Sequence, residues 1–214
     1  KNMNIKTLGN KIKGNPSVAG GTVFSILIII GIGHFLNDMI QSVVPSIYPI
    51  LKDKFGFSFA QIGIITFVFQ ISSSILQPLT GLYADRHPRP YSLSVGMCFT
   101  LVGLLLLAVA SSYALILLSV AVIGIGSSVF HPEASRGRKS LAQSIFQVGG
   151  NGGSALGPLL AAAIVLPFGQ GAISWFALAA ILAAVLLLRV GYWYSARLAY
   201  QMRNNIPAPQ PNTS

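Results

Sequence analysis

GIGHFLNDMIQSVVPSIYP, residues 31–49, places polar side chains inside sequence that is otherwise apolar. Residues 22–32, which lead into this stretch and overlap its first two residues, carry no charge. The polar positions recur at i, i+3, i+4 and i+7, which is one face of an α-helix. They are His34, Asn37, Asp38 and Gln41. Because a carboxylate in hydrocarbon costs roughly 2.5 to 3.5 kcal/mol, we expect this face to line a wet cavity between helices, a first indication of a transport path.

The composition is that of a membrane protein. The chain has 214 residues, of which 53% are hydrophobic and only 8% charged, whereas soluble domains have about 25% charged residues. The net charge of +10 does not indicate nucleic-acid binding, because the basic residues form short clusters between apolar runs. The single cysteine, Cys98, cannot form an internal disulfide. No metal-ligand spacing, phosphate loop or nucleophile–base set is visible, so we expect no cofactor, no metal and no enzyme activity.

The apolar runs predict an all-α membrane protein with six transmembrane helices. Each run approaches or exceeds the roughly 20 residues that cross a bilayer. A basic arm (1–21) precedes the bundle (22–198), and a polar tail or linker (199–214) follows it. Pro45 and Pro49 should kink the first helix near its end. The predicted helices are 22–51, 59–83, 91–110, 113–134, 141–166 and 172–194.

The basic residues predict the orientation of the bundle. Of the 14 Lys and Arg residues, all except Lys52 and Lys54 lie at one set of helix ends: the arm, the loops at 86–89 and 136–139, and the C-terminal end. Cytoplasmic loops carry an excess of Lys and Arg. We therefore expect both termini in the cytoplasm.

A faint internal repeat relates the first and fourth helices. Ile30-Gly31-Ile32-Gly33 matches Ile123-Gly124-Ile125-Gly126, and each is followed by a His and an acid. The two helices would run in opposite directions, as inverted three-helix repeats require.

Two motifs resemble those of the major facilitator superfamily. Gly81-x-x-x-Asp85-Arg86-x-x-Arg89 resembles its loop between helices two and three, although Pro88 stands where a Gly is usual and Pro90 where a basic residue is usual. Helix five carries Gly149, Gly153 and Gly157-Pro158, which resemble the Gly-Pro motif of antiporters in that superfamily. The resemblance implies that this glycine face meets the other half of a transporter and that Asp85 and Arg86 form a cytoplasmic latch. The alternative for the loop is an ordinary polar turn.

Three longer segments are similar to bacterial fosmidomycin resistance proteins, a proton-coupled drug-efflux branch. They are HFLNDMIQS (34–42), SVFHPEASR (128–136) and LAQSIFQVGGNGGS (141–154). The resemblance covers residues 22–198 and implies a multi-pass protein of the bacterial inner membrane. The superfamily has twelve helices, so this chain corresponds to an N-terminal half, and a C-terminal six-helix half is an expected partner. The basic loop after Glu133 is shorter than in that branch.

Four ionisable residues are candidates for proton coupling. Asp38 is the first, because acids inside a membrane usually mark ion pathways; the alternative is a buried acid paired with His34 that fixes helix packing. Glu133 is a second candidate or an interfacial acid satisfied by Arg136. His34 and His131 titrate in a useful range, but membrane histidines often only donate hydrogen bonds to a neighbouring helix.

Several amides are candidates for the substrate cavity. The alternative is that they hold helices together, at roughly 0.6 kcal/mol per contact. For Gln143 and Gln77 we favour the helix-holding interpretation. For the cavity we favour Asn37, Gln41, Gln70, Gln147 and Asn151.

These observations predict a proton-coupled antiporter that exports small drugs, by resemblance fosmidomycin-like phosphonates, through alternating access. Its partners would be the drug, protons, the lipid bilayer and the second half, with no nucleic acid. Two alternatives stay open: a proton symporter for a small polar nutrient, and a non-transporting membrane scaffold subunit.

Overall fold

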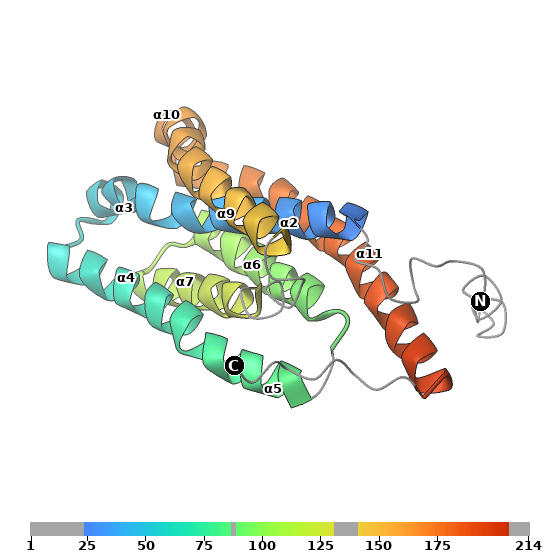
Figure 1. Ribbon diagram of the computed structural model, residues 1–214. Helices are drawn as coiled ribbons and strands as arrows, with labels where there is room; N and C mark the ends of the chain where they lie inside the picture. The colour runs from blue at the N-terminus through green and yellow to red at the C-terminus, as the bar shows by residue number, and fades with distance from the viewer. Residues whose placement is uncertain (1–23, 87–88, 131–140, 206–214) are drawn as a thin grey trace, which may run out of the picture.

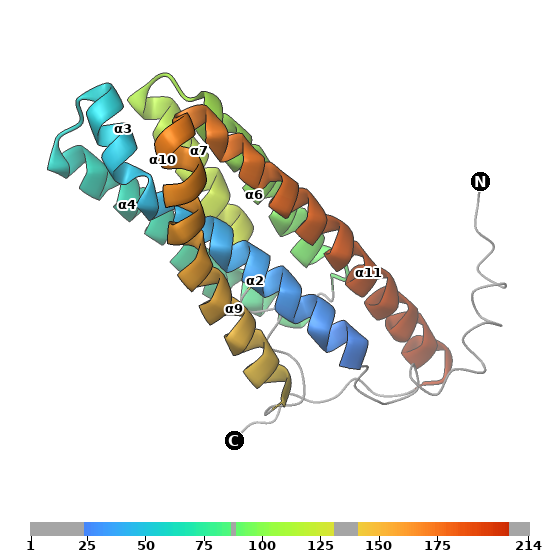
Figure 2. The same cartoon turned by 90° about the horizontal axis from the view of Figure 1, so that it is seen from above.

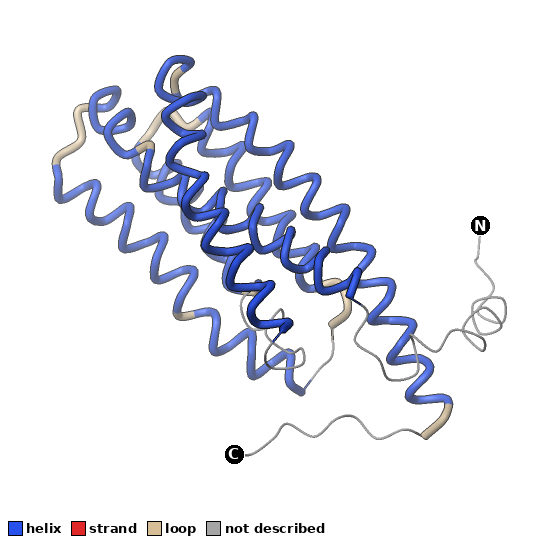
Figure 3. Tube along the Cα trace, turned by 45° about the horizontal axis from the view of Figure 1, so that its top comes forward, coloured by secondary structure: helices blue, strands red, loops and turns tan. Residues whose placement is uncertain are grey.

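The computed structural model describes residues 24–86, 89–130 and 141–205, and every regular element in these ranges is a helix (Figure 3). The long elements lie roughly side by side in one bundle (Figure 1). In chain order they are α2 (Phe24–Ser46), α3 (Tyr48–Phe55), α4 (Phe59–Ser74), α5 (Leu76–Arg86), α6 (Ser92–Val109), α7 (Tyr113–Ser128), α9 (Leu141–Leu160), the π-helix η1 (Ala161–Val165), α10 (Leu166–Phe168), the 3-10 helix η2 (Gln170–Trp175) and α11 (Phe176–Arg203).

Five helical segments are long and apolar enough to cross a membrane, and a sixth is shorter. The five are Phe24–Phe55, Phe59–Tyr83, Ser92–Val109, Gln143–Phe168 and Gln170–Arg203. The shorter one is α7, at 16 residues. The six predicted spans therefore correspond to six observed segments, and the predicted residues 131–134 of the fourth lie outside the described ranges. The chain is a multi-pass membrane protein.

Helix ends differ from the prediction where local capping takes over. The first span is interrupted between Pro45 and Pro49, where a kink was expected: α2 ends and α3 begins on either side of Ile47. The first helix was predicted to end at residue 51, and this is wrong: α3 continues to Phe55. Proline is tolerated in the first turn of a helix, and Gly56, with φ 66°, supplies the left-handed residue that ends this one.

The second and sixth spans also differ in detail. The second is broken at Ile75 into α4 and α5. Pro78, in the first turn of α5, was a usable signal for this break, because proline removes the hydrogen bond to the carbonyl four residues earlier. α5 runs through Arg86 into the stretch predicted as a polar turn. The sixth, predicted to end at Tyr194, continues to Arg203. The first residues of the predicted polar tail are therefore helical.

The core lies among α2, α6, α7 and α11. Ile40, Met97, Ile123 and Leu187, one from each helix, are at most 1% exposed. Large apolar side chains cover the outside; Phe67 and Leu178, for example, are 62% and 60% exposed. An apolar exterior around a packed core is expected of helices that face lipid.

The first three spans (α2 to α6) and the last three (α7 to α11) show the same pattern of helix contacts. α2 packs on α9 in the same way that α4 packs on α7, and α2 contacts α11 as α7 contacts α6. Figure 2 shows α9 and α11 on opposite sides of α2. The two matched glycine pairs take equivalent places: Gly31 faces α9 and Gly124 faces α4, while Gly33 faces α11 and Gly126 faces α6. This shared pattern is what the predicted repeat requires.

Candidate functional site

Three side chains of α2 converge on the carboxylate of Asp38. Asn37 Nδ2 donates to Asp38 Oδ1 at 3.0 Å, and Gln41 Nε2 donates to the same oxygen at 3.3 Å. His34 Nε2 lies 3.1 Å from the other oxygen, Oδ2. The four residues of the predicted stripe therefore form one connected polar unit.

His34 is held between helices. Its side chain is 5% exposed, and Nδ1 lies 2.7 Å from the backbone carbonyl oxygen of Phe146 on α9. The imidazole stacks on the Phe146 ring, with centroids 3.5 Å apart and planes 5° from parallel, and Phe130 lies 5.7 Å away. A carbonyl oxygen, two ring contacts and a carboxylate thus fix both the position and the rotation of the imidazole.

Gly150 makes room for this arrangement. A Cβ at this position would overlap the His34 ring and would lie 2.7 Å from Asp38 Oδ2. Since a real Cβ does not approach other atoms so closely, an alanine there would displace one of the two side chains. The glycine allows the α9 backbone to close over the imidazole and the carboxylate.

The glycine ladder of α9 packs on α2, so the expectation that its face meets another half is wrong. A Cβ on Gly153 would overlap the Phe35 carbonyl oxygen, and one on Gly157 would overlap Ser42 and the Met39 carbonyl. Gly149 has the same relation to Gly31. These are backbone-to-backbone approaches, as small residues permit between membrane helices. Sequence could identify the ladder but not the partner on its face.

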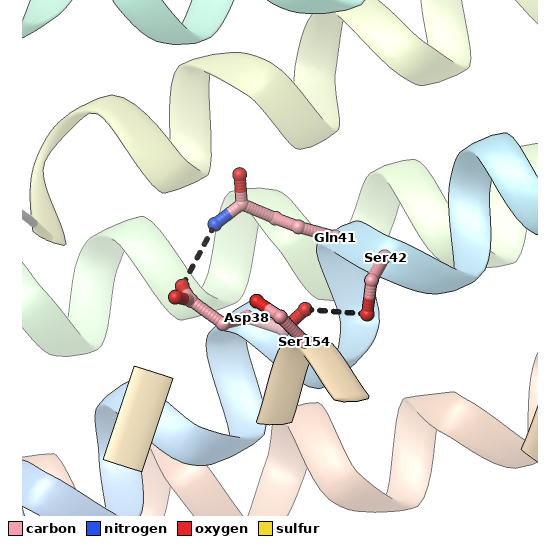
Figure 4. A pocket seen from close by; sticks show the side chains of 4 residues that line it. All are labelled: Asp38, Gln41, Ser42 and Ser154. Atoms are coloured by element: carbon pink, nitrogen blue, oxygen red, sulfur yellow. Dashed lines mark hydrogen bonds between the residues drawn. The ribbon is translucent and has the colours of Figure 1, made fainter. Parts of the chain in front are cut away.

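The open side of Asp38 faces a small depression. Its volume is about 210 Å³, and it is lined by Asp38, Gln41, Ser42 and Ser154 (Figure 4). The Asp38 side chain is 15% exposed. In Figure 4 the Gln41 amide points toward the carboxylate, and Ser154 of α9 approaches the same region. The carboxylate thus lies between a dry side, at His34, and an open side, at Gln41.

The two serines of the depression were not found from the sequence. Ser42 lies one helical turn after Asp38, and its hydroxyl donates to the Asp38 carbonyl oxygen at 2.9 Å. Ser154 follows Gly153 directly. The i+4 spacing was a usable signal for Ser42. For Ser154 there was none, because its position depends on how α9 packs against α2.

The remaining predicted cavity residues do not line this depression. Asn37 is 0% exposed and donates to the carboxylate, so it does not reach the opening. Gln147 and Asn151 lie on an exposed face of α9, where Gln147 Nε2 is 3.5 Å from Asn151 Oδ1. Gln70 is exposed on α4. The structure therefore brings together the α2 residues and leaves the other amides on outer faces.

The residues of the predicted latch are described in part. Gly81, Asp85 and Arg86 lie in α5, and the side chains of Asp85 and Arg86 are outside what the structure describes. Arg89 donates from Nη2 to the Tyr83 hydroxyl at 2.9 Å and lies over its ring. His131 and Glu133, predicted for proton coupling, lie outside the described residues.

The described residues contain no group of three His, Cys, Asp or Glu side chains placed to hold a metal ion. The chemistry available around Asp38 is therefore proton exchange at a carboxylate and an imidazole, together with hydrogen bonding from amides and hydroxyls.

A helical membrane bundle with a partly buried acid at an open depression has the architecture of a transporter half. This chain belongs to the major facilitator superfamily, whose model matches residues 30–214. Proteins of this superfamily are transporters and not enzymes. A solved structure of a bacterial homologue of the human lysosomal transporter Spinster, inward-facing and unoccupied, shares the fold: the TM-score is 0.63 at 18% identity, over 91% of this chain and 47% of that one.

Two curated relatives are much closer in sequence. The chain is 56% identical over 183 residues to the fosmidomycin resistance protein of Escherichia coli (strain K12), which covers 82% of this chain and 45% of that protein. It is 48% identical over 186 residues to the uncharacterized MFS-type transporter YfnC of Bacillus subtilis (strain 168), covering 84% and 46%. The chain thus spans about half the length of the curated relatives it matches.

Proposed function

We propose that this chain forms the N-terminal half of a proton-coupled antiporter that exports small polar drugs across the bacterial inner membrane. The class of cargo, fosmidomycin-like phosphonates, rests on the 56% identity to a fosmidomycin resistance protein. The site rests on one observation: Asp38 is the described membrane-embedded acid that opens onto a depression, with hydrogen-bond donors around it. Acids inside membrane spans are retained chiefly for function.

A second six-helix unit would complete the site, as a further segment or as a separate chain. The depression at Asp38 and the exposed amides Gln147 and Asn151 belong to faces that hydrocarbon cannot solvate. Covering them with a second bundle would convert the shallow depression into an aqueous cavity near the midplane, where transporters of this kind bind their cargo. The glycine ladder does not take part in that contact, because α2 occupies it.

In the proposed cycle Asp38 takes up a proton from the outer side and releases it inside, where cargo then binds. Gln41, Ser42 and Ser154 would contact the cargo, since they line the opening. His34 and Asn37 act on the carboxylate instead, because both are buried and contact it directly. Transport becomes directional only if cargo and proton bind the two open states with different affinity.

The charge of the site favours a second candidate, proton symport. Among the described residues the polar unit contains one acid and, apart from His34, no basic side chain. When the unit has lost its proton it carries a net negative charge, which repels an anion. An anionic cargo would then favour proton uptake, so export of a phosphonate by antiport needs basic groups contributed from beyond these residues.

Flux measurements on the complete protein in liposomes test both candidates. With an imposed pH gradient, antiport moves drug against the direction of proton flow, and symport moves it along with the protons. We expect Asp38→Asn to abolish the proton-driven component while the protein stays folded. Asp53→Asn, which removes an exposed carboxylate from α3, is the matched control and should keep full flux. Full flux in Asp38→Asn would refute the carrier role, and no flux in any variant would indicate a scaffold.

A further inference from the structure

The hydrogen bond between α2 and α9 determines which nitrogen of His34 carries a proton. Nδ1 lies 2.7 Å from the Phe146 carbonyl oxygen, and a carbonyl oxygen only accepts hydrogen bonds. Nδ1 must therefore be the donor and must hold a hydrogen. In a neutral imidazole the other nitrogen, Nε2, then has a lone pair and no hydrogen.

The Nε2 lone pair faces Asp38 across 3.1 Å. An ionised carboxylate is also an acceptor only, so a neutral imidazole and a carboxylate in this arrangement would place two electron-rich atoms in contact in a low-dielectric environment, where their repulsion is poorly screened. One proton, on Nε2 or on Oδ2, converts the repulsion into an attraction. We propose that His34 and Asp38 share one exchangeable proton and bind it as a single site.

The second carboxylate oxygen shows where Asp38 is held once that proton leaves. Oδ1 accepts from Asn37 Nδ2 at 3.0 Å and from Gln41 Nε2 at 3.3 Å. Amide donors of this kind stabilise the ionised form of a carboxylate. Loss of the proton to water in the depression leaves a neutral His34 and an ionised Asp38. The carboxylate then turns from the imidazole toward the two amides and the opening.

Few other ionisable groups face this pair. The described side chains of α9 (143–160) include no acid or base, α7 contributes only Tyr113 at its far end, and Arg189 of α11 is exposed. His131 and Glu133 follow Phe130 in the sequence and lie outside the described residues, so the experiment below replaces both. Within the described chain the proton site is therefore the His34–Asp38 pair.

The shared proton is testable without transport, although its link to cargo movement rests on the proposed function. The chain has three histidines. The background is the complete protein with His87→Gln, His131→Gln and Glu133→Gln. In it, nitrogen-15 NMR reports the protonation of each His34 nitrogen, and infrared spectra report the Asp38 carboxyl. The His34→Asn variant identifies the His34 signals among those of any histidines in a further segment. We expect Nδ1 to hold its hydrogen throughout the pH range. We also expect the Nε2 and Asp38 signals to change together over one pH interval.

The Asp38→Asn variant should separate these signals: the carboxyl change disappears and the Nε2 change moves to a different pH interval. The proposal is overturned if Nε2 and not Nδ1 holds the hydrogen in the neutral ring. It is also overturned if the Nε2 and carboxyl signals change in separate intervals, or if Asp38→Asn leaves the Nε2 change where it was.

A pair of substitutions separates the shared proton from simple packing. Asn in place of His34 keeps a nitrogen donor near the Nδ1 position for the Phe146 carbonyl but has no counterpart of Nε2. We expect His34→Asn to remain folded, to lose the joint proton change and to lose proton-driven flux. His34→Gln, whose amide instead reaches toward the Nε2 position, should likewise lose the joint change. If His34→Asn keeps proton-driven flux, the pair is not the coupling site. If His34→Asn loses flux but the spectra of the protein that retains His34 show no shared proton, the transport proposal stands and the shared-proton proposal fails.

Discussion

At the scale of single residues, Asn37 shows a side chain placed for Asp38 at a cost in stability. It is 0% exposed, its Nδ2 donates to Asp38, and its Oδ1 has no hydrogen-bond partner within the described chain. A buried acceptor left unsatisfied costs about 1 to 3 kcal/mol. A residue that lowers the stability of the protein while it holds a functional group in place is typical of a functional site.

We therefore predict that stability and transport respond in opposite ways at Asn37. Asn37→Leu, similar in volume, should leave the free energy of unfolding unchanged or raise it by about 1 kcal/mol, because the unsatisfied acceptor is removed. Proton-driven flux should fall, because the ionised Asp38 loses a donor. Thermal unfolding in detergent and flux in liposomes measure the two effects. Ser94→Ala, which likewise removes a buried polar atom without a hydrogen-bond partner within the described chain, here a hydroxyl, should match the stability effect and leave flux unchanged. Parental flux in Asn37→Leu would contradict the assignment.

At the scale of elements, the contact of α2 with α9 controls the geometry of the site. Glycines of α9 lie against the α2 backbone one helical turn before and after the level of Asp38 and His34. Because the helices meet through backbone atoms, neither can shift to accommodate a larger residue. The hydrogen bond from His34 to Phe146 depends on this separation, so the spacing of two helices sets the protonation chemistry of one side chain.

We predict that Gly153→Ala destabilises the protein and that Gly152→Ala, on the same helix, does not. A Cβ at Gly153 would overlap the Phe35 carbonyl oxygen, whereas at Gly152 the nearest atom is a Phe35 ring carbon at 3.4 Å. Overpacking costs about 1 to 3 kcal/mol, while alanine in place of glycine inside a helix gains up to about 1 kcal/mol. The midpoints of thermal unfolding should therefore move in opposite directions, and equal midpoints would show that α9 does not pack closely on α2.

A second inter-element contact lies at the opposite end of the bundle. Gln170 is 4% exposed, and its Nε2 donates to the carbonyl oxygens of Leu107 and Ala110 at 2.7 and 2.9 Å. Its Oε1 accepts from Lys54 Nζ at 2.7 Å. One amide thus satisfies the last carbonyls of α6 and ties α3 to η2. Gln170 lies between the predicted helices 141–166 and 172–194, and the sequence could not identify this role, because its partners precede it by 60, 63 and 116 residues.

At the scale of the whole molecule, the exchange symmetry of the two three-helix units has one informative exception. Aligning Gly33 with Gly126 places Ser127 opposite His34. Both residues are buried, but only the α2 position carries an ionisable group. Among the described residues, an imidazole is therefore present at only one of these two equivalent positions, within a repeated scaffold. The same alignment places His131, which lies outside the described residues, opposite Asp38.

We predict that both termini lie on the cytoplasmic side, because the basic residues other than Lys52 and Lys54 gather at that set of helix ends. In a Cys98→Ala background, Asp53→Cys should react with a membrane-impermeant maleimide in intact cells. Asn204→Cys, just after α11, should react only once the membrane is opened. The reverse labelling pattern would invert the topology and, with it, the side from which Asp38 takes up its proton.

The amino-acid sequence by itself determined the class and the helices of this protein. Hydropathy is a local property, so apolar runs identify membrane spans, and the i, i+3, i+4, i+7 spacing places His34, Asn37, Asp38 and Gln41 on one face before any packing is known. Only the tertiary structure decided what that face meets. The partners of His34 and Asp38 on α9 lie more than 100 residues away, as the separation of 112 between His34 and Phe146 shows, and their contacts arise from the angle and distance at which two helices pack.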